Sequence, residues 1–286
     1  MKAITFLLIT LAVSPIWANN IQQGKDHYAA GEFDKAKEIF ETILDENDEN
    51  AEVHHWLGRT FFRLGDIDEA VDHCEESVEL DDKNAEYHFW YGQVLGREVQ
   101  EASVFRQPFL APKVLEEFER TIELDPKHVG GRVGAAQYYL MAPGIMGGDN
   151  EKAEEYAKVL IDMEVSRGYL LLAQVYEAED KIDKAEEVFA QYDAAFNDST
   201  DNPNFYNSYG YFLINQKKYD LAIEKFNRQV ELNPKSANSY DSLGDGYRAA
   251  GRLEEALASY KKAVKINPNF EASKNNIEEL EKELKK

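Results

Sequence analysis

Apolar residues recur three or four positions apart over most of the chain, with charged residues between them. In residues 237–270, Tyr240 and Tyr247 fall on one face of a first predicted helix, and Ala256 and Tyr260 fall on one face of a second. A hairpin of two such helices cannot bury its apolar face alone, so neighbouring hairpins must stack. The pattern therefore predicts an all-α protein built from stacked helix hairpins.

Small residues and helix breakers separate the predicted helices. Gly251 lies between the two helices of this hairpin, where it permits the left-handed turn that ends the first helix. Pro268 ends the second helix, because proline lacks the backbone N–H that a helix needs. Gly244 and Ala256 are small, which predicts that the two helix backbones approach closely at these positions.

The hairpin recurs along the chain with a constant length. Residues 51–84 and 237–270 align without a gap over about 34 positions each. Leu57-Gly58 aligns with Leu243-Gly244. The other matched pairs are Phe61 with Tyr247, Gly65 with Gly251, Ala70 with Ala256, Cys74 with Tyr260 and Val78 with Val264.

These spaced residues resemble the tetratricopeptide repeat (TPR), whose signature is Leu–Gly–Tyr on a first helix, Ala–aromatic–Ala on a second, and then Pro. The resemblance covers nearly all of the chain after residue 18 and is that of an exported bacterial protein. It implies a right-handed α-solenoid of about seven helix hairpins, numbered here as repeats one to seven. In residues 271–286, Ile277, Leu280 and Leu284 form a narrow apolar stripe that predicts a C-terminal capping helix.

The repeat register divides the chain into three segments. Residues 1–18 are expected to form a signal peptide, and residues 19–199 to form repeats one to five. Residues 200–286 are expected to form repeats six and seven plus the capping helix. The polar stretch 197–203 (NDSTDNP) is a predicted hinge between the two blocks of repeats.

The first segment has the features of a secretory signal. Lys2 supplies a positive charge, residues 3–13 are almost wholly apolar, and Ala18 precedes a polar run. We expect cleavage after Ala18 and a soluble, exported protein that is periplasmic or secreted; an uncleaved, buried N-terminal helix is the alternative. The uncapped N-terminal edge left by cleavage is either a homodimer contact or a frayed end.

Charge and cysteine content narrow the classes of partner. The formal net charge of −22 argues against nucleic acid and anionic membranes, because both would be repelled. No segment after the signal is apolar enough to be a membrane helix. Cys74 is the single cysteine, and its place in the repeat predicts burial rather than reactivity.

The resemblance implies a concave groove lined by the first helix of each repeat. Five of the ten arginines fall on lining positions, so the groove is nearly neutral in an acidic chain. Arginine suits the recognition of carboxylates and phosphates, although surface pairing with nearby glutamates would also account for these residues. The predicted partner-binding residues are His55, Arg59, Phe62, Arg63, Phe89, Gln93, Arg97, Gln137, Arg167, Gln174 and Tyr211.

Repeats three and four are longer than the others, with apolar insertions at residues 97–111 and 142–148. We expect Pro112 to begin the second helix of repeat three and Asp149 to cap the second helix of repeat four. Equivalent loops of adjacent repeats lie side by side, so these insertions either pack on each other or form the wall of a binding pocket.

Motifs for catalysis, metal binding and cofactor binding are not found in the sequence. We expect no cofactor and a non-enzymatic protein-interaction scaffold or adaptor. Its partner would be a protein or peptide in the concave groove, with an acidic group or a C-terminal carboxylate. The alternative is a binding protein for a small anionic molecule, using a pocket formed by repeats three to five and their inserted loops.

Overall fold

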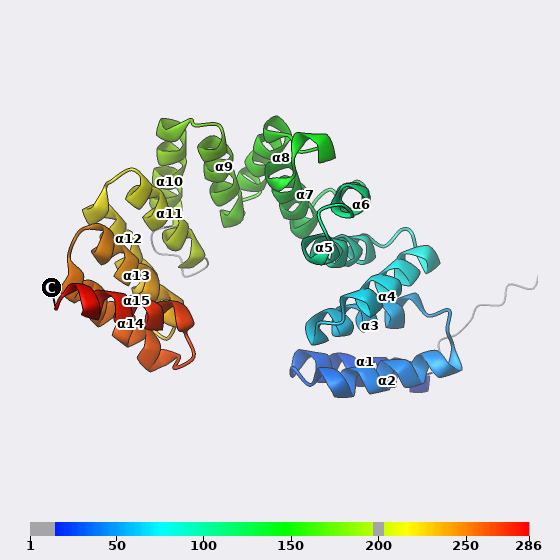
Figure 1. Ribbon diagram of the computed structural model, residues 1–286. Helices are drawn as coiled ribbons and strands as arrows, with labels where there is room; N and C mark the ends of the chain where they lie inside the picture. Colours follow the sequence, from blue (N-terminus) through cyan, green and yellow to red (C-terminus); the bar gives the residue numbers. More distant parts are fainter. Residues whose placement is uncertain (1–14, 197–202, 286) are drawn as a thin grey trace, which may run out of the picture. The chain divides into compact units, whose positions relative to one another are not determined.

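The computed structural model describes residues 15–196 and 203–285, which form fifteen α-helices, one short 3₁₀ helix and no strand. Fourteen of the α-helices pair in sequence as seven hairpins, as predicted (Figure 1). The helices of the first four hairpins are α1 (Pro15–Ala29), α2 (Phe33–Glu46), α3 (Ala51–Leu64), α4 (Ile67–Leu80), α5 (Ala85–Glu101), α6 (Gln107–Leu124), α7 (Val129–Met141), the 3₁₀ helix η1 (Gly144–Met146) and α8 (Asn150–Asp162). The others are α9 (Ser166–Ala178), α10 (Ile182–Phe196), α11 (Pro203–Asn215), α12 (Tyr219–Leu232), α13 (Ala237–Ala249), α14 (Leu253–Ile266) and α15 (Glu271–Glu283).

The contacts between residues divide the chain into an N-terminal unit, Met1–Tyr156, and a C-terminal unit, Ala157–Lys286. The boundary lies inside α8, whereas the sequence pattern favoured a hinge at 197–203. Residues 197–202 and most of the predicted signal peptide lie outside the described residues, so the hinge and the signal stay predictions.

Glycines end the first helices of the regular repeats, as predicted. Gly65 follows α3 with φ +87°, and Gly251 follows α13 with φ +74°. Both values lie in the left-handed region, where a side chain would be strained. At the start of α8, the carboxylate of Asp149 accepts hydrogen bonds from the backbone N–H groups of Glu151 and Lys152, which confirms the predicted cap.

The small residues of the repeat make room for large side chains as well as for backbone. At Gly58 a Cβ would lie 3.1 Å from the backbone nitrogen of Cys74, so backbones do approach there. At Gly244 the space is filled by the ring of Tyr260 instead, 2.5 Å from where a Cβ would lie. The nearest atoms at Gly244 are therefore side-chain atoms, because an aromatic side chain on the second helix stands where the other repeat has the smaller Cys74.

Cys74 is fully buried in the core of the N-terminal unit, as its repeat position predicted. Burial raises the pKa of its thiol to about 12, because an apolar environment disfavours the thiolate. The side chain therefore serves as a small apolar packing group.

The insertion in repeat three lengthens two helices instead of forming a long loop. Helix α5 continues to Glu101, and α6 begins at Gln107, so Pro112 lies inside α6. The expectation that Pro112 starts this helix is wrong, because Pro108 already occupies the first turn, where a missing N–H costs nothing.

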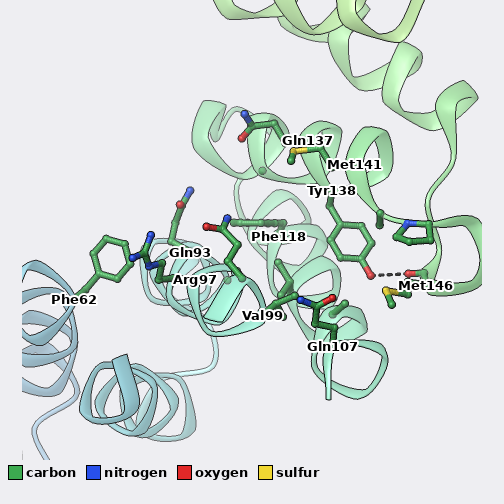
Figure 2. A pocket seen from close by; sticks show the side chains of 18 residues that line it. Phe62, Gln93, Arg97, Val99, Gln107, Phe118, Gln137, Tyr138, Met141 and Met146 are labelled. Atoms are coloured by element: carbon green, nitrogen blue, oxygen red, sulfur yellow. Dashed lines mark hydrogen bonds between the residues drawn. The ribbon is translucent and has the colours of Figure 1, made fainter. Parts of the chain in front are cut away.

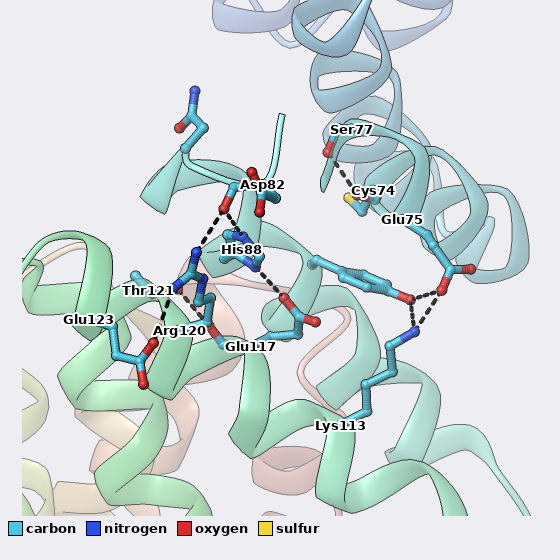
Figure 3. Close-up of polar contacts among 12 residues, drawn as sticks. Cys74, Glu75, Ser77, Asp82, His88, Lys113, Glu117, Arg120, Thr121 and Glu123 are labelled. Atoms are coloured by element: carbon cyan, nitrogen blue, oxygen red, sulfur yellow. Dashed lines mark hydrogen bonds and ion pairs between the residues drawn. The ribbon is translucent and has the colours of Figure 1, made fainter. Parts of the chain in front are cut away.

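A buried polar pair joins the two helices of repeat three (Figure 3). His88 Nδ1 on α5 lies 2.6 Å from a carboxylate oxygen of Glu117 on α6, and His88 Nε2 lies 3.0 Å from the carbonyl oxygen of Asp82. Burial acts to lower the pKa of His88, but the hydrogen bonds to Glu117 and Asp82 outweigh burial and raise it. The pair ties the turn before α5 to α6.

Helix α15 caps the last repeat, as predicted. Leu280 is fully buried against Ala256 and Tyr260 of α14, and Ile277 packs partly against the same cluster. Leu284, the third member of the predicted stripe, stays 44% exposed at the end of the helix. The cap therefore covers the last hairpin through Leu280, with Ile277 beside it.

Candidate partner-binding site

Arg59 on α3 is held between aromatic rings of the N-terminal unit. Its guanidinium carbon lies 4.0 Å from the ring centroid of Trp56, 4.4 Å from that of Trp90 and 5.2 Å from that of Tyr28. Within the described residues, no carboxylate pairs with Arg59, and its buried Nε has no hydrogen-bond partner. The rings therefore fix a cation whose charge is not balanced by an ion pair.

The repeat itself places these rings. Trp56 lies three residues before Arg59 on α3, which puts both side chains on one helix face. Trp90 occupies on α5 the position that Trp56 has on α3, about 34 residues or one repeat later. Successive first helices thus bring equivalent tryptophan rings to 4.0 Å and 4.4 Å from one guanidinium carbon.

His55 does not reach the surface, so its predicted contact with a partner is wrong. Its side chain lies next to Trp56 and Tyr87 and is only 3% exposed. Burial, with a smaller contribution from the charge of Arg59, lowers the pKa of His55 to about 3, so the ring is neutral. The Nη1 group of Arg59 lies 3.4 Å from His55 Nε2, where it donates a long hydrogen bond. The buried ring of His55 therefore contacts the guanidinium of Arg59 from the interior of the unit.

Three other arginines on first helices, Arg63, Arg97 and Arg248, fall into two classes. Arg63 lies 4.7 Å from the ring of Phe33 and, among the described residues, has no carboxylate partner. Arg97 and Arg248 do have one, at 2.7 Å and 2.9 Å. Pairing with glutamates therefore explains Arg97 and Arg248, but it does not explain Arg59 and Arg63.

Four predicted residues, Phe62, Gln93, Arg97 and Gln137, line one pocket of about 620 Å³ in the N-terminal unit (Figure 2). They come from α3, α5 and α7, the first helices of repeats two to four. The pocket floor is Phe118 on α6, and the insertions supply further walls. Repeat five contributes no residue to this lining, contrary to the expected extent of the pocket.

The insertions form pocket walls, while their apolar tips stay exposed. Gln107 and Ala111 line the pocket from the first insertion, and Pro143 and Met146 line it from the second. The hydroxyl of Tyr138 donates a 2.6 Å hydrogen bond to the carbonyl oxygen of Met146, which holds the second insertion against α7. Large apolar side chains beyond these walls are mostly exposed: Phe105 (84%), Phe109 (85%) and Ile145 (91%).

The remaining predicted residues belong neither to the aromatic contact of Arg59 nor to the pocket lining. Phe89 packs against His128 and Phe118, with centroid separations of 4.9 Å and 6.3 Å. In the C-terminal unit, the hydroxyl of Tyr211 donates to Asp245 at 2.6 Å, so it is already satisfied internally. Arg167 and Gln174 lie half-buried on α9, and burial lowers the pKa of Arg167.

The sequence reasoning missed Trp56 and Trp90, because neither occupies a position that was assigned to the groove lining. Their separation by one repeat was a usable signal, since it places two large rings around the arginine between them. Tyr138 was also missed, because its role depends on where the second insertion folds back.

Over residues 15–196 and 203–285, no helix combines the length and apolarity needed to cross a bilayer. The same residues hold no cluster of three or more His, Cys, Asp or Glu side chains suited to a metal ion.

Comparison with curated proteins finds repeat-containing segments of larger chains. Heat shock protein STI1 of Saccharomyces cerevisiae is 30% identical over 98 residues, which are 34% of this chain and 16% of STI1. Protein O-mannosyl-transferase TMTC1 of Homo sapiens is 23% identical over 176 residues, which are 59% of this chain and 19% of TMTC1. The chain thus spans less than a fifth of either relative.

A solved tetratricopeptide repeat protein from Parabacteroides merdae superposes with a TM-score of 0.68 at 18% identity, covering 93% of this chain and 99% of that one. At this identity the likeness concerns the fold. Tetratricopeptide repeat family profiles match residues 21–85 and 202–269. Together with the seven helix hairpins and the glycine-ended first helices, these matches show that the chain belongs to the tetratricopeptide repeat family.

Proposed function

We propose that this protein is a non-enzymatic scaffold that binds a protein or peptide partner on the first helices of its N-terminal repeats. Arg59 and Arg63 receive a carboxylate of that partner, from an acidic side chain or a chain end. The observation that carries the proposal is the Arg59 guanidinium, held between Trp56 and Trp90 without a carboxylate partner among the described residues.

Aromatic rings hold an arginine in a way that leaves it able to bind. Ring faces attract the cation and fix its plane, yet they accept none of its N–H groups in strong hydrogen bonds. Among the residues that the structure describes, the hydrogen-bond acceptor found near Arg59 is His55 Nε2 at 3.4 Å, which is long for a hydrogen bond. A planar carboxylate from outside would supply the charge-assisted, bidentate partner that the described part of the chain does not provide.

Family membership supports a binding role more than a catalytic one. Two relatives are named as transferases: TMTC1 matches over only 19% of its own length, and the probable UDP-N-acetylglucosamine–peptide N-acetylglucosaminyltransferase SPINDLY of Solanum lycopersicum over 7%. Transferase chemistry would require residues for which this sequence has no motif, and the imidazole beside Arg59, that of His55, is buried with its pKa lowered to about 3, which makes it a weak base. We therefore assign the chain a scaffold role.

The alternative of a small anionic ligand in the pocket has less support. Arg97 is the single charged residue of the pocket lining, and its Nε already lies 2.7 Å from a carboxylate oxygen of Glu101. An anion in this pocket would have to displace that pairing, whereas at Arg59 it would meet an unpaired cation.

The test is an affinity isolation from extracts of the source organism, with the purified chain as bait. We expect Arg59→Ala/Arg63→Ala to bind its partner about 100-fold more weakly, because two charge-assisted contacts are lost. The matched control is Arg248→Ala/Arg252→Ala, which removes the same charge from arginines that are paired within the chain and lie outside the pocket. Equal recovery of partners by both variants would contradict the proposal.

Export belongs to the same proposal, on the basis of residues 1–18 alone. Mass spectrometry of the N-terminus from fractionated cells should find a chain that begins at Asn19 in an exported fraction. A chain that keeps its first residues in the cytosolic fraction would contradict export. Homodimer formation through the N-terminal edge is checked by sedimentation equilibrium of the same material.

A further inference from the structure

The pocket between repeats two and four is not used by the arginine site. The ring of Phe118 fits at the floor of the pocket because Gly92 and Gly134 have no side chains. A Cβ at either position would lie within 2.9 Å of this ring. Its volume of about 620 Å³ exceeds that of one side chain and falls in the usual range of ligand pockets, roughly 300–1,000 Å³. The pocket is therefore large enough for several side-chain groups of a ligand.

The pocket is bounded by parts of the chain that a regular repeat lacks. The extension of α5 contributes Val99 and Gln100, and the early start of α6 contributes Gln107. On the opposite side, the second insertion contributes Met146, and the hydrogen bond from Tyr138 holds it there (Figure 2). The site is thus particular to the two enlarged repeats of this chain.

The lining offers amides and apolar surface rather than charge. Among the described residues, no carboxylate lines the pocket although the chain carries a net charge of −22, and Arg97 is paired with Glu101. The side-chain amides of Gln93, Gln100 and Gln137 make no hydrogen bond within the part of the chain that the structure describes. Each amide presents one acceptor and two donors, which match the C=O and N–H of a peptide group.

The pocket also lies next to the arginine site, since Phe62 of its lining packs against Trp90 with ring centroids 6.2 Å apart. Phe62 lines the pocket and lies three residues after Arg59 on α3, one turn along the same helix face. An extended segment that leaves the arginines along α3 would therefore meet the pocket next. Thioethers of Met141 and Met146, which adapt to ligands of different shape, line the far side.

We propose that this pocket binds an uncharged, apolar segment of the protein partner. One or two bulky apolar side chains enter the pocket above Phe118, and the segment's backbone amides bond to Gln93, Gln100 and Gln137. The inference rests on the proposed function only in that its occupant is part of a protein partner. Binding at the pocket does not require Arg59 or Arg63.

The methionines allow a direct test, because the chain has only four, Met1, Met141, Met146 and Met163. The full chain is labelled with ¹³C-methyl methionine and titrated with N-acetyl-Ala-Phe-Leu-Ala-amide, with N-acetyl-Ala-Ser-Ser-Ala-amide as the control probe. We expect the first probe to shift the Met141 and Met146 signals and to leave Met163 on the C-terminal unit unchanged. The serine probe should shift none of them.

Gly96→Phe is the blocking variant. A Cβ at Gly96 meets only the side chain of Val114, at 3.8 Å, so the new ring enters the pocket without displacing backbone. Phenylalanine is also a better helix former than glycine, so the fold is retained, which a melting curve checks. We expect Gly96→Phe to weaken binding of the apolar probe at least about tenfold. Arg59→Ala/Arg63→Ala should bind this probe like the wild type.

Three results would overturn the proposal. Wild-type binding of the apolar probe by a folded Gly96→Phe chain would place the probe elsewhere. Equal shifts of Met163 and the two pocket methionines would mean unspecific binding. A small molecule that co-purifies with the wild type but not with Gly96→Phe, seen by native mass spectrometry, would show a different occupant. Loss of acidic-partner binding in the arginine variant, with the apolar probe unaffected, separates this proposal from the proposed function.

Discussion

The two units use the polar residues of their first helices in different ways. In the N-terminal unit, Arg59 stacks on tryptophans and the amides of Gln93 and Gln137 make no hydrogen bond among the described residues. In the C-terminal unit, Tyr211 donates to Asp245 and Arg248 pairs with Glu279 of the capping helix. At these positions the N-terminal lining leaves donors and acceptors for a ligand, whereas the C-terminal lining satisfies its own. Arg167 and Gln174 on α9 differ, because neither has a hydrogen-bond partner among the described residues.

The difference shows that a residue type on a lining position does not by itself indicate binding. An arginine paired with a carboxylate stabilises the chain slightly, and a ligand must replace that partner before it can bind. An arginine held by ring faces keeps its N–H groups. An arginine on a first helix therefore forms an internal ion pair at Arg248 but a candidate binding site at Arg59.

The largest effect is expected at Asp245, an internal hydrogen-bond acceptor of the C-terminal lining. Asp245 accepts hydrogen bonds from the hydroxyls of Tyr211 and Tyr260, at 2.6 Å and 2.7 Å. Asp245→Ala leaves two partly buried hydroxyls without their acceptor, so we expect the free energy of unfolding to fall by about 3 kcal/mol. Urea denaturation followed by circular dichroism measures this loss. A loss below about 0.5 kcal/mol would mean that these internal hydrogen bonds do not distinguish the C-terminal lining from that of the N-terminal unit.

The second-largest effect on stability is expected at Trp56, whose ring contacts Arg59. Trp56 contacts Arg59 on one face and packs edge-on against Tyr28 on another side. Trp56→Ala should lower the free energy of unfolding by about 2 kcal/mol, because a half-buried ring and a cation–π contact are lost together. The same urea titration measures it, with Trp56→Phe as the control that keeps a ring. An equal loss of unfolding free energy in both variants would show that the aromatic ring face does not account for the stabilisation.

The pH dependence of the C-terminal lining gives a smaller effect with a defined sign. Burial, followed by the charge of Asp245, raises the pKa of Asp241 despite its hydrogen bond from Ser273. A raised pKa in the folded state means that stability is fullest below the unfolded value of 3.8 and falls as the pH rises through the folded value.

Asp241→Asn removes this titration and keeps an acceptor for Ser273. We expect the variant to exceed the wild type in free energy of unfolding at pH 7 by up to about 1 kcal/mol. The advantage should vanish near pH 3.5, where the aspartate is protonated. Melting curves at both pH values measure it, and an advantage that persists at pH 3.5 would contradict the assigned cause.

The smallest effects separate the two classes of arginine. Arg248→Ala removes an exposed ion pair and should cost about 0.5 kcal/mol of unfolding free energy, reduced further by salt. Arg63→Ala removes no ion pair and should change stability by less than about 0.3 kcal/mol. Denaturation at low and at high salt compares them. A salt-sensitive loss at Arg63 would reveal a carboxylate partner and weaken the case for the arginine site.

The candidate site was predictable in part. Phe62, Gln93, Arg97 and Gln137 were predicted as lining residues, and they do meet around one pocket. The burial of His55 was not predictable from its lining position, because Tyr87 from the next repeat packs over it. The path of the first insertion was also misread, since a second proline five residues after the true helix start gave the same signal as a first-turn proline.

The sequence by itself determined the architecture. A pattern repeated over about 34 residues specifies helices, left-handed glycine turns, a buried Cys74 and a capping helix, because each of these depends on nearby residues or on the register of the repeat. Only the tertiary structure decided which arginines are paired and where a pocket opens. Those properties depend on side chains that neighbouring helices bring together, such as Trp90 beside Arg59 and Glu279 beside Arg248, and no local pattern encodes their distances.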